Sequence, residues 1–289
     1  MKIGISTYSL HRSLENGEMT VPAAIRWLAE RGAQHVELVP IGFTLVQNPS
    51  LIEAIREQAI KSNIAISNYA VRGNFITKDS DQYERSIQEL KSQVDIAHQL
   101  GVHLLRHDVA WRPIPETSIA KFEEDLPSLV SACQRIADYA ANFGITTSVE
   151  NHGFFVQASD RVSRLVQLVN RPNFRTTIDV GNFLCVDEDP VAAVRKNLPI
   201  ASMIHLKDFY IRKSSPVVGR GFFETAGGHL LRGAILGHGD IDLPAIMQEI
   251  IKSGYDGYLS VEFEGIEDDQ LGTEISLQNA LILTQRKDG

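Results

Sequence analysis

The feature that most limits the fold of this sequence is an eightfold alternation of short β-rich runs with longer helical segments. Residues 80–100 and 119–143, for example, repeat apolar side chains with the 3.6-residue period of a helix. Strands that alternate with helices form right-handed βαβ units around a parallel sheet, and eight such units favour a closed (β/α)8 TIM barrel over an open doubly wound sheet. The β-rich runs are Ile3–Ser6, Val36–Val39, Ile64–Ser67, His103–Arg106, Thr146–Val149, Thr176–Ile178, Ser202–His205 and Tyr258–Val261.

The helical segments carry ordinary start and stop signals. Thr20 and Asp242 are typical N-cap residues and stand before expected helices. Further helices are predicted over residues 22–31, 50–62 and 243–253. Four segments end at a glycine that soon leads into a β-rich run, as expected for helix ends in the left-handed conformation. These glycines are Gly32, Gly101, Gly144 and Gly254.

The chain shows no internal boundary. Because no Gly/Ser/Pro-rich linker or shift in composition divides it, we predict a single α/β domain over residues 1–289. Two connections are longer than a minimal turn, Val39–Pro49 and Phe209–Asp240. In a barrel of this type the long loops that follow strands lie at the carboxyl ends of the strands, where active sites form.

Composition excludes several classes of protein. The chain is 43% hydrophobic and 22% charged, and no apolar run approaches the roughly 20 residues of a membrane helix. With 36 acidic and 28 basic residues, its net charge of -8 disfavours binding to nucleic acid. The N-terminus MKIGISTYSLH lacks the features of a secretory signal, which predicts a cytoplasmic protein. Cys133 and Cys185 have no metal-binding spacing and are expected to be reduced, structural thiols.

Metal-ligating residues stand at four of the last five strand ends. Glu150, Asp179 and Glu262 directly follow β-rich runs, and His205 ends one. Each residue alone has an ordinary explanation, such as an ion pair or a turn cap, but in a closed barrel all four would meet at one mouth. Three neighbouring carboxylates repel one another by several kcal/mol unless a cation compensates them. This donor set predicts a divalent metal site that suits Mn2+, Mg2+ or Co2+ and is compatible with Zn2+.

Four segments, SVENHG, TIDVGNF, IHLKD and GYDGYLSVEFE, resemble in this order the motifs of the xylose-isomerase-like TIM-barrel superfamily of sugar isomerases and epimerases. That group includes tagatose and psicose 3-epimerases, hydroxypyruvate isomerase and inositol-catabolism isomerases. The resemblance covers the whole chain and is strongest from Thr146 to Glu264. It implies that Glu150, Asp179, His205 and Glu262 are the metal ligands. It further implies that the two glutamates are the proton-transferring catalytic pair.

Two positions depart from the epimerase pattern. Epimerases of this superfamily often carry a histidine three residues after the aspartate, where this chain has Asn182. An amide can hydrogen-bond a substrate hydroxyl but cannot exchange a proton near neutral pH. The arginine that those enzymes carry after the seventh strand has no exact counterpart, and Arg212 and Arg220 are the nearby candidates. The identity of the reaction therefore stays open at this stage.

Metal-assisted proton transfer at a carbon next to a carbonyl explains the predicted residues. A metal that binds the carbonyl stabilises the enediolate formed when a glutamate removes the proton. Delivery of the proton to the opposite face gives epimerisation, and delivery to the adjacent carbon gives isomerisation. Weaker candidates for substrate contact stand at or near the strand ends and in the long loop. These are His152, Asn182, Lys207, Asp208, His107, Glu37, Tyr8 and Arg212.

Other functions remain open from the sequence. The same type of barrel resembles that of dehydroshikimate and inosose dehydratases, which are lyases. An endonuclease-IV-like abasic-site nuclease would need more histidine ligands, and a silent sugar-binding protein would not need the glutamate pair. LGHGD, residues 236–240, could hold a phosphate or form a tight turn. The expected partner is a small sugar or sugar-derived molecule, with a homodimer or homotetramer as the assembly that the superfamily implies.

Overall fold

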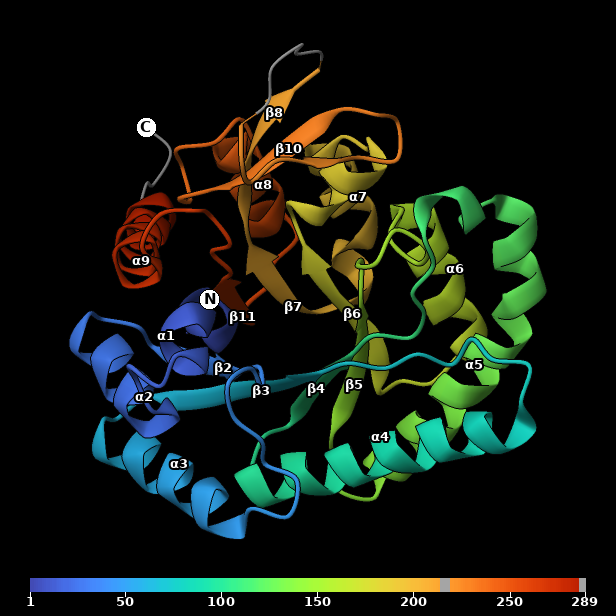
Figure 1. Cartoon of the computed structure of the whole chain (residues 1–289), viewed down its shortest axis with the longest axis horizontal. Helices are drawn as coiled ribbons and strands as arrows, with labels where there is room; N and C mark the ends of the chain where they lie inside the picture. Colours follow the sequence, from blue (N-terminus) through green and yellow to red (C-terminus); the bar gives the residue numbers. More distant parts are fainter. Residues whose placement is uncertain (214–218, 286–289) are drawn as a thin grey trace.

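The computed structural model describes residues 1–213 and 219–285, which form a closed barrel of eight parallel strands enclosed by helices (Figure 1). The strands follow one another around the barrel in the order β1-β11-β7-β6-β5-β4-β3-β2. The predicted (β/α)8 fold is therefore confirmed. The barrel strands are β1 (Lys2–Ser6), β2 (His35–Leu38), β3 (Ala65–Val71), β4 (Leu104–His107), β5 (Thr146–Glu150), β6 (Phe174–Asp179), β7 (Ala201–Leu206) and β11 (Tyr258–Val261).

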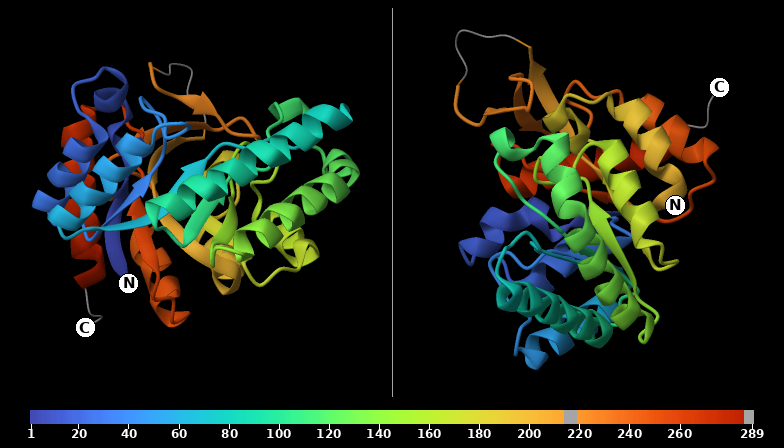
Figure 2. Two further views of the ribbon diagram at one scale, coloured as in Figure 1. Left: turned by 90° about the horizontal axis from the view of Figure 1, so that it is seen from below. Right: turned by 90° about the vertical axis from the view of Figure 1, so that its right-hand side faces the viewer.

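Helices cover the outside of the barrel, as the views in Figure 2 show. The helices predicted from the sequence coincide with α2, α3, α4, α5 and α8 to within two residues at each end. Short 3-10 turns follow several strands. The α-helices are α1 (His11–Glu15), α2 (Val21–Glu30), α3 (Pro49–Lys61), α4 (Ser80–Leu100), α5 (Ile119–Ala141), α6 (Ser159–Val169), α7 (Pro190–Asn197), α8 (Leu243–Lys252) and α9 (Asp269–Gln285). The 3-10 turns are η1 (Thr7–Leu10), η2 (Ile114–Glu116), η3 (Asn182–Val186) and η4 (Leu198–Ile200).

Local sequence signals set the ends of these helices. The Thr20 hydroxyl accepts a hydrogen bond from the backbone N–H of Ala23, and Asp242 accepts one from Ala245. Each bond satisfies an N–H group that has no partner inside its helix. At the other end of α4, Gly101 has a φ of 76°, a left-handed conformation that a side chain would disfavour.

Strand alternation divides the side chains of the barrel between two environments. Val149, Ile178, Ile204 and Val261 are buried in the apolar core. Because successive strand residues point to opposite faces, the residue after each of them turns toward the barrel axis. The metal-ligand candidates are these following residues, so the packing of the core directs them to the mouth.

The long connection after β7 contains a small antiparallel sheet, where the sequence predicted only a loop. Its strands are β8 (Asp208–Arg212), β9 (Phe223–Glu224) and β10 (Leu230–Ala234), arranged in the order β8-β10-β9. Phe209 and Leu231 of this sheet are buried, so pairing of its strands shields apolar side chains from water. The sheet projects beyond the ring of helices (Figure 2). It follows β7 directly and therefore lies at the carboxyl end of the barrel.

Within the described part of the chain, none of the helices combines the length and the apolar character needed to cross a membrane.

Candidate metal centre and substrate cavity

Four side chains that are far apart in the sequence meet at the carboxyl end of the barrel. Glu150 and Asp179 end β5 and β6, His205 lies in β7, and Glu262 follows β11. One ligand atom from each of them lies within 4.8 Å of the others. Atoms bound about 2.1 Å from a common ion are about 3 to 4 Å apart, so a small adjustment suffices for all four to share one ion. The cluster is a candidate site for a single metal.

The ring of His205 is oriented for metal binding. Its Nε2 lies 3.0 Å from Oε1 of Glu37, which also accepts a hydrogen bond from Asn68. With a proton on Nε2, the opposite nitrogen presents a lone pair to the cluster. Nδ1 has no hydrogen-bond partner among the described residues, and it lies 3.7 Å from Glu150 and 3.9 Å from Glu262. A carboxylate that holds the far side of a histidine is the usual support for a metal ligand.

The turn after β6 fixes the carboxylate of Asp179. Its Oδ1 accepts hydrogen bonds from the backbone N–H groups of Gly181 at 2.8 Å and Asn182 at 2.9 Å. Its Oδ2 is left facing the cluster, 3.0 Å from the ammonium group of Lys207. Burial raises the pKa of Asp179 to about 6, with Lys207 opposing the shift and the neighbouring carboxylates adding to it. One oxygen thus shapes the turn while the other remains available to a cation.

Negative charge exceeds positive charge in this region. Two permanent cations, Arg106 and Lys207, face a larger number of carboxylates. Arg106 donates to Glu150 at 2.5 Å and pairs with Asp108 at 3.2 Å. The carboxylates are Glu37, Asp108, Glu150, Asp179, Glu262 and Glu264. A divalent cation would offset part of the excess, which is a second reason why the donor set fits a metal ion.

Both glutamates of the cluster lie against cationic side chains. Burial disfavours the charged form of Glu150, but Arg106 and His205 outweigh it and hold the pKa of Glu150 well below its usual value. The ammonium group of Lys207 lies 2.9 Å from Glu262 and 3.3 Å from Glu264. Burial lowers the pKa of Lys207, but Asp179 and the glutamates outweigh it and raise that pKa well above the usual value. With its pKa lowered in this way, Glu150 can act as an anionic metal ligand at neutral pH.

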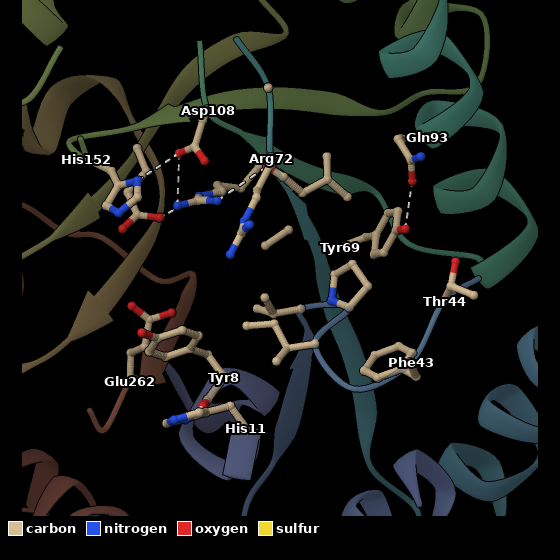
Figure 3. A pocket seen from close by; sticks show the side chains of 18 of the residues that line it. Tyr8, His11, Phe43, Thr44, Tyr69, Arg72, Gln93, Asp108, His152 and Glu262 are labelled. Atoms are coloured by element: carbon tan, nitrogen blue, oxygen red, sulfur yellow. Dashed lines mark hydrogen bonds and ion pairs between the residues drawn. The ribbon is translucent and has the colours of Figure 1, made fainter. Parts of the chain in front are cut away.

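A cavity of about 880 Å3 opens onto the cluster (Figure 3). The loop after β2 lines it with apolar side chains, among them Ile41 and Phe43, and Tyr8 lies near Glu262. Burial, and secondly the charge of Glu264, raise the pKa of Tyr8 to about 12, so its hydroxyl remains protonated. The cavity thus has a charged floor and a partly apolar wall, as is usual for a site that binds a small organic molecule.

A histidine–aspartate pair lies at the rim of the cavity. Nδ1 of His152 is 3.1 Å from Oδ1 of Asp108, and half of the His152 side chain is exposed. Burial acts to lower the pKa of His152, but the hydrogen bond and charge of Asp108 raise it overall. Since Asp108 engages one ring nitrogen, the other is left for a substrate. Figure 3 shows this pair on the wall above Glu262.

Asn182 is part of the hydrogen-bond network of the cluster. Its Nδ2 donates to Glu150 at 3.0 Å, and its Oδ1 accepts from Lys207 at 3.3 Å. The amide thereby connects the carboxylate of Glu150 with the ammonium group that pairs with three other carboxylates. At the position where many epimerases carry a histidine, this chain has a residue that fixes the charges of the site.

Five of the eight predicted substrate contacts do not line this cavity, namely Glu37, His107, Asn182, Asp208 and Arg212. The ring of His107 is buried between Phe75 and Phe174, because strand alternation turns Arg106 inward and His107 toward the helices. Burial lowers the pKa of His107 to about 4. Arg212 is half exposed and pairs with Asp240 at 3.4 Å. These placements correct the sequence-based expectation for both residues.

Asp208 has a structural role that the sequence did not reveal. Its carboxylate accepts hydrogen bonds from the backbone N–H groups of Gly237 at 2.9 Å, Gly239 at 2.8 Å and Ile241 at 3.3 Å. The N–H groups of Gly237 and Gly239 belong to the segment LGHGD, which the sequence offered as a phosphate site. The protein's own carboxylate occupies them, so the segment is a tight turn fixed by Asp208.

Several residues of the site were missed or undervalued in the sequence. Arg106 and Asp108 line the cavity, although only the histidine between them had been chosen. Arg72, directly after β3, and Glu264, two residues after Glu262, line it as well. Because side chains in a strand alternate between its two faces, Arg106 and Asp108 could have been selected together from the end of β4. No sequence signal distinguishes Arg72.

Comparison with known proteins decides the family. The family model described as xylose isomerase-like TIM barrel matches residues 25–281. The chain belongs to this family. The resemblance seen in the motifs is thereby confirmed.

Two curated relatives are inosose dehydratases. The protein from Clostridium perfringens strain 13 is 25% identical over 75% of this chain and 75% of its own length. The protein from Lactiplantibacillus plantarum is 24% identical over 68% of this chain and 66% of its own length. This chain therefore matches about two thirds to three quarters of these relatives.

Solved structures with different activities share the fold. A probable 3-DHS dehydratase from Bacillus anthracis has a TM-score of 0.74 and 17% identity over 99% of this chain and 100% of its own. D-allulose 3-epimerase from Methylomonas sp. has a TM-score of 0.72 and 16% identity over 99% and 97%. The IOLI protein with a bound zinc atom has a TM-score of 0.74 and 19% identity over 98% and 96%. At such identities the likeness concerns the fold alone.

Proposed function

We propose that this chain is a divalent-metal-dependent lyase that removes water from a polyhydroxylated ketone of the inosose type. The observation that carries the proposal is the meeting of Glu150, Asp179, His205 and Glu262 beneath a cavity that also holds the His152–Asp108 pair. Two curated relatives named inosose dehydratase support water loss as the reaction. The dehydratase alternative thus has more support than the isomerase or epimerase that the motifs first suggested.

The four-residue cluster would hold the metal. Three carboxylates and one imidazole suit Mn2+, Mg2+ or Co2+, and the zinc in a structural neighbour keeps Zn2+ as a candidate. A bound divalent ion supplies Lewis acidity, which favours loss of a proton from a carbon next to a carbonyl. Glu37 holds His205 in the orientation needed for ligation, so its role is to position a ligand rather than to bind substrate.

His152 is the group best placed to transfer the proton. It lines the cavity, Asp108 holds its Nδ1, and its other ring nitrogen can reach a substrate. His152 takes the proton from the carbon next to the carbonyl, the C–O bond at the neighbouring carbon breaks, and the same imidazolium gives that proton to the departing hydroxyl. The products are an unsaturated ketone and one water molecule, and His152 returns to its neutral form.

The remaining polar groups of the cavity would orient the substrate. Tyr8 and Lys207 line the cavity and can donate hydrogen bonds to its hydroxyl groups. Lys207 and Asn182 also fix the carboxylates of the cluster. The expected partner is accordingly a small sugar-derived molecule.

Epimerisation is the second candidate. Glu150 and Glu262 come from β5 and β11, and a D-allulose 3-epimerase shares the fold. As a proton-transferring pair they would act on the two faces of a bound sugar. However, Glu150 is paired with Arg106, which lowers its pKa and weakens it as a base, and Glu262 is paired with Lys207.

Product mass separates these reactions. We expect the metal-loaded protein, incubated with inososes, ketoses and keto acids, to give a product lighter than its substrate by one water. His152→Ala should lower kcat/KM by about 10²- to 10⁴-fold with unchanged metal content, as for loss of a general base. His229→Ala is the matched control, because His229 forms a similar pair with Asp187 at 2.8 Å but does not line the cavity.

The opposite results are equally clear. A product of unchanged mass, with deuterium from the solvent at a carbon next to the carbonyl, would establish an isomerase or epimerase. Full activity of His152→Ala would remove the assignment of the base.

A further inference from the structure

Arg72 stands out among the charged residues of the cavity. It directly follows β3, and Figure 3 shows its side chain projecting into the cavity. Among the hydrogen bonds and ion pairs of the described residues, none involves the Arg72 side chain. The other permanent cations of the lining, Arg106 and Lys207, are both paired with carboxylates. Arg72 is therefore the lining cation whose charge is available to a ligand.

The backbone on both sides of Arg72 is fixed. The carbonyl of Val71 accepts the backbone N–H of Asp108 at 3.3 Å, and the N–H of Phe75 is bonded to the carbonyl of Val109 at 2.9 Å. Between them, Gly73 lies so close to Asp108 that an added Cβ would be 2.4 Å from its carbonyl oxygen. Because this segment is tied to the end of β4, the guanidinium group extends from a defined point on the wall.

A second donor lies beside Arg72. Asn74 lines the cavity, and its Oδ1 accepts a hydrogen bond from the backbone N–H of Ile76 at 3.2 Å. Its NH2 group is thereby left as a donor. A guanidinium group and an amide on one short segment are suited to the oxygens of a carboxylate or phosphate, and a neutral polyol does not require the positive charge.

The distribution of charge in the cavity gives the substrate a direction. The floor carries the carboxylates, among them the candidate metal ligands, and these negative groups repel anions. A cation bound there would favour the hydroxyl and carbonyl oxygens of a substrate. We infer that the substrate carries an anionic group that Arg72 binds, while its hydroxyketone part lies toward the cluster. This inference rests on the proposed function and narrows the substrate class to polyhydroxylated ketones that carry an anionic group, which an unsubstituted inosose lacks.

Binding of unreactive cyclic polyols tests the inference without requiring turnover. The full chain, loaded with Mn2+, is titrated calorimetrically with quinate, myo-inositol 1-phosphate and myo-inositol. The first probe carries a carboxylate, the second a phosphate and the third no charge. We expect at least one anionic probe to bind about 10- to 100-fold more tightly than myo-inositol, as for a charge-assisted hydrogen-bonded pair. The preferred anionic probe identifies the group.

Two variants test whether this preference comes from Arg72 or from the bound metal. Arg72→Gln should abolish the preference for the anionic probe and leave the affinity for myo-inositol unchanged. Arg56→Gln should keep the preference, because Arg56 is an exposed residue of α3 that does not line the cavity. Equal binding of charged and neutral probes, or a preference that persists in Arg72→Gln, would overturn the inference. Neither result depends on water loss. The proposed reaction can therefore be wrong while anion binding is confirmed, and anion binding can be absent while the proposed reaction is confirmed.

Discussion

The two ends of the barrel each bury a histidine, and the two side chains have opposite properties. His205 lies at the carboxyl end and His35 at the amino end, and both are almost completely shielded from solvent. Burial lowers the pKa of both, but the carboxylates of Glu37, Glu150 and Glu262 raise that of His205 well above its usual value. At His35, a hydrogen bond to the carbonyl of Leu259 offsets burial only in part, and the pKa is about 4.

This difference shows what makes a buried histidine functional. At the amino end, the His35 ring packs against Tyr258 at a centroid distance of 4.8 Å and fills space that Gly4 leaves open. At the carboxyl end, the ring of His205 has carboxylates on both sides and a free nitrogen between two of them. Burial alone therefore produces a packing residue, whereas burial among unbalanced carboxylates produces a candidate metal ligand.

The strongest test of the carboxyl end is loss of a ligand. In Asp179→Asn, the amide oxygen can still accept the N–H groups of Gly181 and Asn182, so the turn should persist while an anionic ligand is lost. We expect loss of stoichiometric metal and a fall in kcat/KM of at least about 10³-fold, equivalent to several kcal/mol of lost charge stabilisation. Elemental analysis after dialysis and steady-state rates measure both.

Asp160→Asn on the surface of α6 is the control for this variant and should keep both metal and activity. Chelation of the wild-type protein should reproduce the defect, and added Mn2+ should reverse it. A metal content in Asp179→Asn equal to that of the wild type would contradict the assignment of the cluster.

The amino end is tested through the pH dependence of stability. Below pH 6.5 the unfolded chain binds a proton at His35 that the folded chain accepts only near pH 4. The contribution of the neutral His35 ring to the free energy of unfolding is therefore fully present above pH 6.5. This contribution is lost as the pH falls toward 4, and the loss is about 3 kcal/mol in total. Urea unfolding of wild type and His35→Gln between pH 4 and 7.5 should show this component only in the wild type.

His103→Gln, at an exposed position before β4, controls for removal of a histidine as such. Identical pH profiles for wild type and His35→Gln would show that the two ends do not differ in the way described.

The smallest expected effect concerns the support of His205. Glu37→Gln should leave the fold intact, since glutamine can still accept the hydrogen bond from Asn68. Loss of the carboxylate that polarises His205 should weaken metal binding by about 10- to 100-fold. Competition with a fluorescent chelator measures this affinity. An unchanged affinity would indicate that the ring of His205 is oriented by packing alone.

The fold and the central cluster were largely predictable from the sequence. Eight alternating units specify a barrel, and in a barrel of parallel strands every carboxyl end faces the same mouth, so Glu150 and Glu262 approach each other despite their distance in the chain. The surrounding residues were less predictable. His107 was chosen although Arg106 faces the cavity, because a shift of one residue in the position of a strand exchanges its two faces.

The sequence by itself determined the barrel and the residues that close its strands, because hydrophobic periodicity and chain order are enough to place strand ends together. Only the tertiary structure decided which charges meet. It placed Lys207 among three carboxylates, left Arg72 facing the cavity, and used Asp208 to close a turn. Such pairings depend on side-chain directions within a few ångströms, and local periodicity does not specify these directions.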